Sequence, residues 1–549
     1  MIRLILALIF LSLMNVFIYK SLSTSFELSP VSKKILGFSL MTAGGLYPVV
    51  YLVQIAFNIN RMTVYPLLYA GDIWILSLPG FCTMGALLIG LTRAFPGRQR
   101  LRLPVALVSF PALFLFMVNL FPYRVLYPSY GWPALNLNRY GIIFLVVVIV
   151  YKIISRTLGS ELTEKKKGGL IILLSLGAAA EFVGMWYISG LLAVFGLYAM
   201  VYSRIATGLG LSKKIRRMLM GLFSVGFILS IPQMTFWGNA LGIPLLYYAG
   251  GAWFGFMAMA MPLFIIESSL DLVWRSFRKQ RVIVLLVILA LAGGYSLYNA
   301  SRIPVVKELT IPLKKLPEEM SGFTIVQVSD VHLGDLVSPS WFEKTVEKIN
   351  SLNPHLIVIT GDLIDRGIGY GSRFLDSLKK LDARFGKFAI TGNHEYYNNR
   401  LHIFLDIAKK AGIKVLRNNS VTINRGIQLV GMNDWNAGVY DEDDFPPSLS
   451  LAMRHVDKRK PVIMLFHSPG MFGEGIQGGV DLQLSGHTHA GQIPPLDLIS
   501  YLREEYFYGL YREGESYIYV TGGTGLYATP MRLFSRNEIA LITLIKIPD

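Results

Sequence analysis

The sequence predicts an α/β domain that follows an all-α polytopic transmembrane domain. Three observations support this fold class. Apolar runs fill the chain up to Ala300, short strand-like and helix-like segments with interleaved charges follow, and polar clusters come directly after several apolar strands. A hydrophobic fraction of 53% with only 16% charged residues is unusual for a soluble protein. We therefore predict a membrane domain over residues 1–300 and an α/β domain over residues 301–549.

The first domain is predicted to contain about ten membrane-spanning helices, because each span needs about 20 apolar residues. Leu170–Ser203 is too long for one span and short for two, and we divide it into two. The predicted spans are Leu4–Tyr19, Ile35–Phe57, Ile73–Leu91, Leu103–Phe121, Tyr140–Ile154, Leu170–Tyr187, Ile188–Ser203, Met218–Trp237, Ile243–Ile266 and Val282–Tyr298.

Basic residues lie in alternate loops between these spans, and such loops tend to stay in the cytoplasm. The last basic loop holds Arg275, Arg278, Lys279 and Arg281, so the final span crosses outward. We expect a multi-pass protein of the cell membrane with its α/β domain on the extracytoplasmic side.

The net charge of +17 belongs to the membrane domain. Residues 1–300 hold 25 Lys and Arg against 7 Asp and Glu, whereas residues 301–549 hold 27 against 28. Basic residues that flank apolar spans meet anionic lipid head groups, so we expect the lipid bilayer as a partner and no nucleic acid. The single cysteine, Cys82, excludes an intrachain disulfide and a cysteine-based zinc site.

In the second domain, five polar clusters follow apolar strands in sequence order. Open α/β sheets place ligand sites at strand ends, because the loops converge there on a rigid base. The strands and the residues that follow them are Phe323–Val328 with Asp330 and His332, His355–Thr360 with Asp362, Phe388–Ile390 with Asn393 and His394, Val462–Phe466 with His467, and Leu482–Leu484 with His487 and His489.

These clusters supply imidazole, carboxylate and carboxamide groups without thiolate, which suits Mn²⁺, Fe or Zn²⁺. One bridging carboxylate can hold two divalent ions about 3.5 to 4 Å apart, which is the arrangement used for phosphoryl displacement. His394 stands next to a candidate ligand and is available for proton transfer. The candidate metal ligands are Asp330, His332, Asp362, Asn393, His467, His487 and His489.

The motifs resemble those of the calcineurin-like metallophosphoesterase superfamily over about Val305–Ile547. The family blocks are Asp-x-His, Gly-Asp-x-x-Asp-Arg, Gly-Asn-His-Glu/Asp, His and Gly-His-x-His. Here they read Asp330-Val331-His332, Gly361-Asp362-Leu363-Ile364-Asp365-Arg366, Gly392-Asn393-His394-Glu395, His467 and Gly486-His487-Thr488-His489. The runs Ser485–Gln492 and Arg536–Ile542 look like the YkuE-type branch, whose members are often attached to membranes.

This resemblance implies a four-layer αββα sandwich and a two-metal site. One metal ion would be held by Asp330, His332, Asp362 and His489, and the other by Asp362, Asn393, His467 and His487. Asp362 would bridge the two ions. His394, oriented by Asp365, would stabilise or protonate the leaving oxygen, and Arg366 would hold a phosphate oxygen.

The resemblance is specific for the metal site but leaves the substrate open. A short linker after Tyr298 places the second domain close to the bilayer, and ten spans exceed what anchoring requires. We therefore expect a metal-dependent phosphodiesterase or phosphatase that acts on a phosphate ester or diphosphate, with a lipid-linked substrate as a hypothesis. A second interpretation is a membrane transporter or channel with a regulatory phosphoesterase domain. Intact ligand positions favour the enzyme, and the sequence indicates no oligomeric state.

Overall fold

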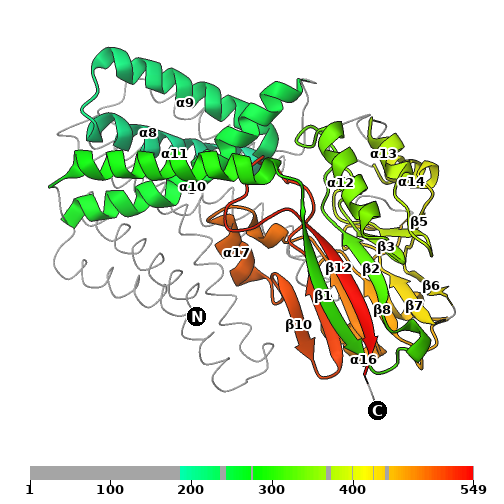
Figure 1. Ribbon diagram of the computed structural model, residues 1–549. Helices are drawn as coiled ribbons and strands as arrows, with labels where there is room; N and C mark the ends of the chain where they lie inside the picture. The colour runs from blue at the N-terminus through cyan, green and yellow to red at the C-terminus, as the bar shows by residue number, and fades with distance from the viewer. Residues whose placement is uncertain are drawn as a thin grey trace, which may run out of the picture. The chain divides into compact units, whose positions relative to one another are not determined.

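The computed structural model of the protein describes residues 186–234, 243–273, 276–365, 373–397, 400–424, 426–438 and 444–547 (Figure 1). The chain divides into two compact units. One comprises residues 1–223 and 260–286, and the other comprises residues 224–259 and 287–549.

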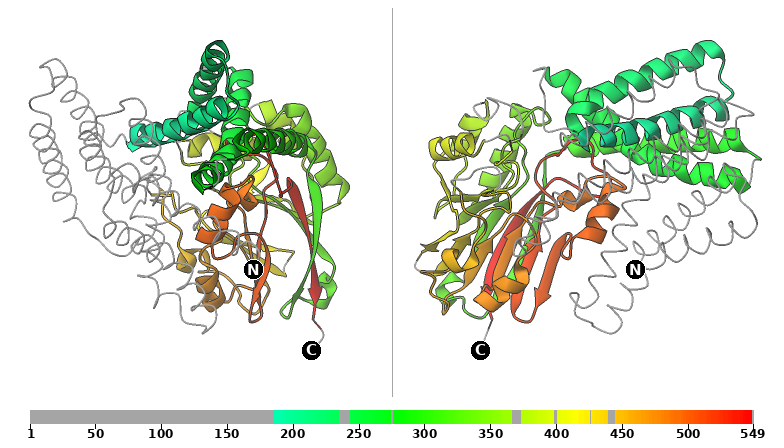
Figure 2. Two further views of the ribbon diagram at one scale, coloured as in Figure 1. Left: turned by 90° about the vertical axis from the view of Figure 1, so that its left-hand side faces the viewer. Right: turned by 180° about the vertical axis from the view of Figure 1, so that it is seen from behind.

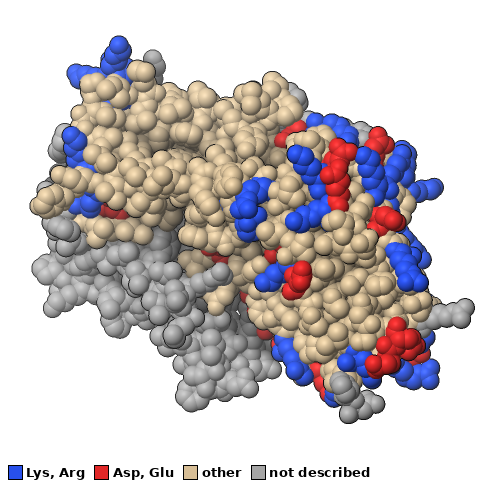
Figure 3. Space-filling model, in the orientation of Figure 1, with Lys and Arg blue, Asp and Glu red and all other residues tan. Residues whose placement is uncertain are grey.

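Long apolar helices precede the α/β region. They are α8 (Trp186–Gly208), α9 (Lys213–Met234), α10 (Pro244–Val273) and α11 (Arg278–Ser301). Within the described residues, three segments are long and apolar enough to cross a membrane: Lys213–Gln233, Pro244–Asp271 and Arg278–Ser301. Large apolar side chains such as Leu291 stay exposed on them, and charged side chains are sparse along the visible face of the helices (Figure 3).

These helices match the end of the predicted membrane domain. The three candidate spans overlap the last three predicted ones, and α8 contains the predicted span Ile188–Ser203. This confirms that membrane helices precede the α/β region. The six earlier predicted spans, together with Cys82, lie outside the described residues apart from the last two residues of Leu170–Tyr187. The count of ten therefore stays a prediction.

In the unit that includes residues 260–286, a cluster of ion pairs joins α8, α10 and α11. Glu267 of α10 is 2% exposed, and its carboxylate lies 3.1 Å from Arg204 Nε and 3.2 Å from Arg281 Nη2. Asp271, one turn later, accepts hydrogen bonds from Arg278 Nε at 2.6 Å and Arg281 Nη2 at 2.9 Å. Two carboxylates thus neutralise basic residues near the helix ends, where an unpaired charge would be costly.

The α/β region contains two six-stranded sheets. The first has the strand order β1-β12-β2-β3-β4-β5 and the second β10-β11-β9-β8-β7-β6. Strands β2 to β5 run parallel, as do β7, β8, β9 and β11. The strands are β1 (Val305–Leu313), β2 (Phe323–Val328), β3 (Leu356–Thr360), β4 (Lys387–Ile390), β5 (Ile413–Val415), β6 (Asn419–Ile423), β7 (Ile427–Gly431), β8 (Val462–Leu465), β9 (Leu482–Ser485), β10 (Gly509–Glu513), β11 (Ser516–Val520) and β12 (Glu538–Lys546).

Helices flank both sheets. Those of the α/β region are α12 (Pro339–Ser351), α13 (Leu375–Lys379), α14 (Leu401–Lys410), α15 (Leu449–Ala452), α16 (Phe472–Gly478) and α17 (Leu496–Arg503), with the 3₁₀ turns η2 (Glu318–Met320) and η4 (His489–Gly491). Helix α12 begins with Ser338 as its N-cap and Pro339 in its first turn, both of which favour helix initiation.

Alternate residues of each strand face different layers, which explains the near-continuous apolar runs. In β3, Ile357 and Ile359 pack against Phe342 of α12 on the outer side of the first sheet. Leu356 and Val358 face inward instead, and the inward cluster joins residues of both sheets, which lie face to face (Figure 2). A third cluster packs α15 against the outer face of the second sheet. The predicted four-layer αββα sandwich is therefore confirmed.

The ion-pair cluster predicts that Glu267→Gln destabilises the protein, because it leaves two arginines without one of their carboxylate partners. We expect a loss of about 3 kcal/mol in unfolding free energy. Thermal unfolding of the purified chain in detergent measures it, with Glu308→Gln on the exposed face of edge strand β1 as the control. Equal midpoints for the two variants would show that the cluster does not stabilise the helices.

Candidate metal centre

The seven candidate metal ligands meet at the carboxyl ends of β2, β3, β4, β8 and β9. Each lies within four residues of the end of its strand, so the two sheets together supply all seven candidate ligands. Five of them have a left-handed backbone, which non-glycine residues rarely adopt: Asp330, His332, Asp362, His487 and His489, with φ between 49° and 71°. Such strain is typical of functional sites, where the surrounding structure enforces it.

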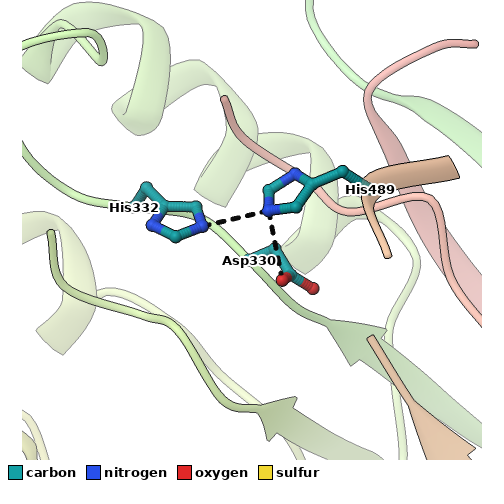
Figure 4. Close-up of side chains that lie close together, drawn as sticks. All are labelled: Asp330, His332 and His489. Atoms are coloured by element: carbon teal, nitrogen blue, oxygen red, sulfur yellow. Dashed lines mark hydrogen bonds and ion pairs between the residues drawn. The ribbon is translucent and has the colours of Figure 1, made fainter. Parts of the chain in front are cut away.

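Figure 4 shows a first group of candidate ligands, formed by Asp330, His332 and His489. The Nε2 atoms of His332 and His489 lie 3.1 Å apart. His489 Nε2 also lies 3.4 Å from an oxygen of Asp330. The ligand atoms of this group lie within 4.8 Å of one another, and all three residues are buried.

A second group lies beside the first and comprises Asp330, Asp362 and His467. His467 Nε2 lies 3.3 Å from Asp362 Oδ2 and 3.1 Å from Asn393 Oδ1. The same Asn393 oxygen is 3.0 Å from His487 Nδ1. Asp362 Oδ2 lies 3.7 Å from His332 Nε2, so its carboxylate is within reach of both groups.

The donor chemistry fits divalent metal ions. Burial lowers the pKa of His332 to about 3 and that of His489 well below its usual range, so both imidazoles stay neutral, the form that ligates metals. The Nε2 atoms of His332 and His489 face each other, and so do His467 Nε2 and His487 Nδ1. Imidazole nitrogens gathered in this way suit a divalent transition metal ion. The buried Nδ1 atoms of His332 and His489 have no hydrogen-bond partner within the described part of the chain.

His394 lies next to the ligand groups and is oriented by a carboxylate. Its Nδ1 is 3.2 Å from Asp365 Oδ1, and its ring centroid is 4.5 Å from that of His332. His394 also donates its backbone N–H to Asp362 Oδ1 at 2.9 Å. The structure therefore brings together the predicted pair His394 and Asp365, whereas Arg366 lies outside the described residues.

The loops that carry Asp362 and Asn393 are held together by Glu395, to which the sequence analysis assigned no role. Its buried carboxylate accepts backbone N–H groups of Asp362 at 2.9 Å and Gly392 at 2.7 Å through one oxygen. The other oxygen accepts those of Leu363 and Ile364. Burial raises the pKa of Glu395 to about 7, while the N–H groups favour its ionised form. The position of Glu395 in the Gly392–Glu395 motif is the sequence feature from which a role at the site could have been predicted.

Close backbone approach explains two glycines of the motifs. A Cβ on Gly392 would lie 2.3 Å from Asp362 Oδ1, and one on Gly361 would lie 2.5 Å from His467 Nδ1. Gly361 also has φ of 92°, which glycine adopts at little cost. These two glycines let the ends of β3, β4 and β8 approach one another until the side chains of Asp362 and His467 meet.

Two further residues at the site were missed from the sequence. Tyr527 lies over the rings of His332, His394 and His489, with ring centroids 5.1 to 5.8 Å away. Arg532 is fully buried and donates to the backbone oxygen of His489 at 3.2 Å. Both follow the Gly-rich run Thr521–Gly525, which the sequence analysis did not connect with the site.

Comparison with known proteins identifies relatives of this region. Residues 323–491 match the family model "Calcineurin-like phosphoesterase". The chain is 36% identical over 278 residues to "Transmembrane protein with metallophosphoesterase domain" of Danio rerio, which covers 49% of this chain and 63% of that protein. This chain therefore spans less than two thirds of the length of that relative.

Bacterial relatives are covered more fully. An uncharacterized metallophosphoesterase of Helicobacter pylori strain J99 is 35% identical over 261 residues, 47% of this chain and 69% of that protein. The uncharacterized metallophosphoesterase YkuE of Bacillus subtilis is 32% identical over 267 residues, 46% of this chain and 89% of that protein. The similarity thus covers the half of the chain that carries the site.

The hydrogen bonds of Glu395 predict that Glu395→Gln lowers the stability of the protein. A carboxamide presents N–H groups where backbone N–H groups must be accepted, which leaves buried donors unpaired. We expect a loss of about 1 to 3 kcal/mol in unfolding free energy. Chemical denaturation measures it against Glu343→Gln, whose exposed carboxylate pairs with Lys380 at the surface. A loss no larger than in that control would contradict the role of Glu395.

Proposed function

Because this chain belongs to the calcineurin-like metallophosphoesterase family, we propose that it hydrolyses a phosphate ester or diphosphate at a two-metal centre beside the membrane. The observation that carries this proposal is the convergence of seven candidate ligand side chains from two sheets, six of them buried. The chain is a membrane protein by its candidate spans and by its transmembrane relatives.

The proposed ligand sets follow the two groups of side chains. One ion would be held by Asp330, His332, Asp362 and His489, and the other by Asp362, Asn393, His467 and His487. The position of Asp362 within reach of both groups supports its proposed role as the bridge. Divalent ions bound there would activate water and neutralise charge on the phosphoryl oxygens.

His394 is the proposed proton donor to the leaving oxygen. Its Nδ1 faces Asp365, which leaves Nε2 to carry the transferred proton. Asp365 would fix the tautomer and the orientation of the ring, because a carboxylate accepts the proton of Nδ1. Arg366, the residue after Asp365, is proposed to hold a phosphate oxygen.

The proposed substrate is a lipid-linked phosphate or diphosphate on the extracytoplasmic side. Helix α11 ends at Ser301 and strand β1 begins at Val305, so only a few residues separate a candidate span from the α/β region. This short connection supports a position of the hydrolytic site near the lipid head groups. The alternation of basic loops in the sequence supports the extracytoplasmic placement.

The catalytic proposal predicts that Asp362→Asn and His394→Ala each lower turnover about a hundredfold or more. The first change weakens the proposed bridge, and the second removes the proton donor. Asp406→Asn and His402→Ala on exposed positions of α14 are the matched controls. Steady-state rates on a bis-aryl phosphodiester measure the effect, and unchanged rates in both variants would rule out the mechanism.

The lipid proposal predicts that purified full-length protein with Mn²⁺ prefers lipid diphosphates. We expect kcat/KM on lipid diphosphates in mixed micelles to exceed that on soluble nucleotides by about tenfold or more, since remote contacts with the lipid contribute binding energy. Faster turnover of the soluble esters would contradict the lipid substrate while leaving the phosphoesterase activity in place.

A further inference from the structure

The chain between β11 and β12 connects the metal centre with residues 244–259 of α10 and residues 287–301 of α11, which belong to the same compact unit. We name residues 526–532 of this connection the bridging segment. It begins just after Gly525, where the backbone passes so close to Val331 that a Cβ would lie 2.0 Å from the Val331 oxygen. This contact places the start of the bridging segment beside the loop that carries Asp330 and His332.

At the metal centre, the bridging segment contributes the ring of Tyr527. The ring is 5.1 Å from His394 and nearly perpendicular to it, at 87°. It is tilted by 35° over His332 and stacks at 29° on His489. One aromatic ring therefore limits the rotation of two proposed metal ligands and of the proposed proton donor.

The ligand loop after β9 holds the bridging segment in this position. Gln492, three residues after His489, donates to the oxygens of Tyr527 and Thr529 at 2.9 Å and accepts the N–H of Tyr527 at 3.0 Å. Arg532 donates to His489 O at 3.2 Å and to Gly525 O at 2.9 Å. The guanidinium of Arg532, at the end of the segment, thus contacts both the loop that carries His489 and Gly525, the residue before the segment begins.

On its other side, the bridging segment packs on α10 and α11. A Cβ on Gly255 of α10 would lie 2.3 Å from Thr529 Oγ1 and 2.7 Å from Met531 Sδ. One turn earlier, a Cβ on Gly251 would lie 2.9 Å from Ala528 O. The bridging segment therefore packs closely on the face of α10 that carries Gly251 and Gly255, where a larger residue would collide with it.

Helix α11 fixes the end of the segment by hydrogen bonds. Ser296 O accepts the N–H of Arg532 at 3.1 Å. Asn299 Nδ2 donates to Arg532 O at 3.0 Å and to Ser535 O at 2.8 Å, and Asn299 is 2% exposed. These contacts join residues more than 230 positions apart in the sequence.

We infer that Tyr527 is a positioning residue of the metal centre and that α10 and α11 fix its place through the bridging segment, so that hydrolysis depends on the membrane helices. This inference rests on the proposed hydrolytic function. A shift of the segment on α10 moves the Tyr527 ring and releases the imidazoles that it packs against. Misplacement of catalytic groups by about 1 Å can lower a rate a hundredfold.

The test compares Gly255→Ala with Gly294→Ala in the full-length protein in detergent. Both changes add one methyl group and the same helix propensity, but a Cβ on Gly294 meets no atom of the described residues within 4 Å. Amide hydrogen exchange over residues 524–537 and kcat on a soluble bis-aryl phosphodiester are measured. We expect Gly255→Ala to increase exchange in the segment and to lower kcat about tenfold or more, with wild-type behaviour in Gly294→Ala.

A second pair of variants tests the ring itself. Tyr527→Phe keeps the ring and is expected to retain kcat within about threefold, whereas Tyr527→Ala is expected to lower it about tenfold or more at little change in KM. This pair stays informative if Gly255→Ala does not fold.

Three results would overturn the inference. Wild-type kcat in Tyr527→Ala would show that the ring does not position the site. Faster exchange in Gly255→Ala without loss of kcat would show that the helices do not act on it. A wild-type protein without activity on any phosphoester would instead reject the proposed function, and the coupling with it.

Discussion

Two loops of the metal centre are joined by a buried carboxylate that is not a proposed ligand. Glu395 accepts N–H groups from residues 362, 363 and 364 and from Gly392, while Asp362 in turn accepts the N–H of His394. These hydrogen bonds fix the strand ends of β3 and β4 against each other. The proposed bridge, one proposed ligand and the proposed proton donor all depend on this link.

The remaining ligands are placed by the meeting of two sheets. Gln327 of β2 donates to Ser485 O at the end of β9 at 3.0 Å, and the carboxylate of Asp330 accepts the N–H of His487 at 3.1 Å. The first sheet therefore reaches the second at the same edge where the ligands lie. Left-handed backbone at Asp330, Asp362 and three histidines is tolerated because these loops are buried and hydrogen-bonded on several sides.

Much of this arrangement could be predicted from local sequence. Apolar strands followed by short polar motifs fixed β2, β3, β4, β8 and β9 to within one or two residues, because a buried parallel strand has a distinctive apolar run. The resemblance of the motifs to a known family implied in addition that His394 and Asp365 would lie together. The α/β class and the preceding membrane helices were predicted correctly for the same reason, since both follow from local apolar patterning. The four-layer sandwich was implied by the resemblance of the motifs to a known family.

Contacts between distant segments could not be predicted. Tyr527 is about 195 positions from His332 in the chain, and neither a motif nor a periodic pattern relates them. The fully buried Arg532 would be predicted from sequence to be a surface cation. Its burial depends on carbonyl groups such as that of His489, 43 residues earlier in the chain. The ion pairs of Glu267 and Asp271 likewise join three helices. The basic residues after α10 could be recognised in the sequence, but the carboxylates that pair with them could not be predicted.

We propose above that seven side chains form a centre for two divalent ions. The most direct test is the metal content of the purified full-length chain, measured by plasma mass spectrometry after loading with Mn²⁺ and removal of weakly bound metal. We expect about two ions per wild-type chain and fewer than one in Asp362→Ala, because the proposed bridge contributes to both positions. A wild-type chain that retains no ion, or an Asp362→Ala chain that retains as many as the wild type, would contradict the proposal.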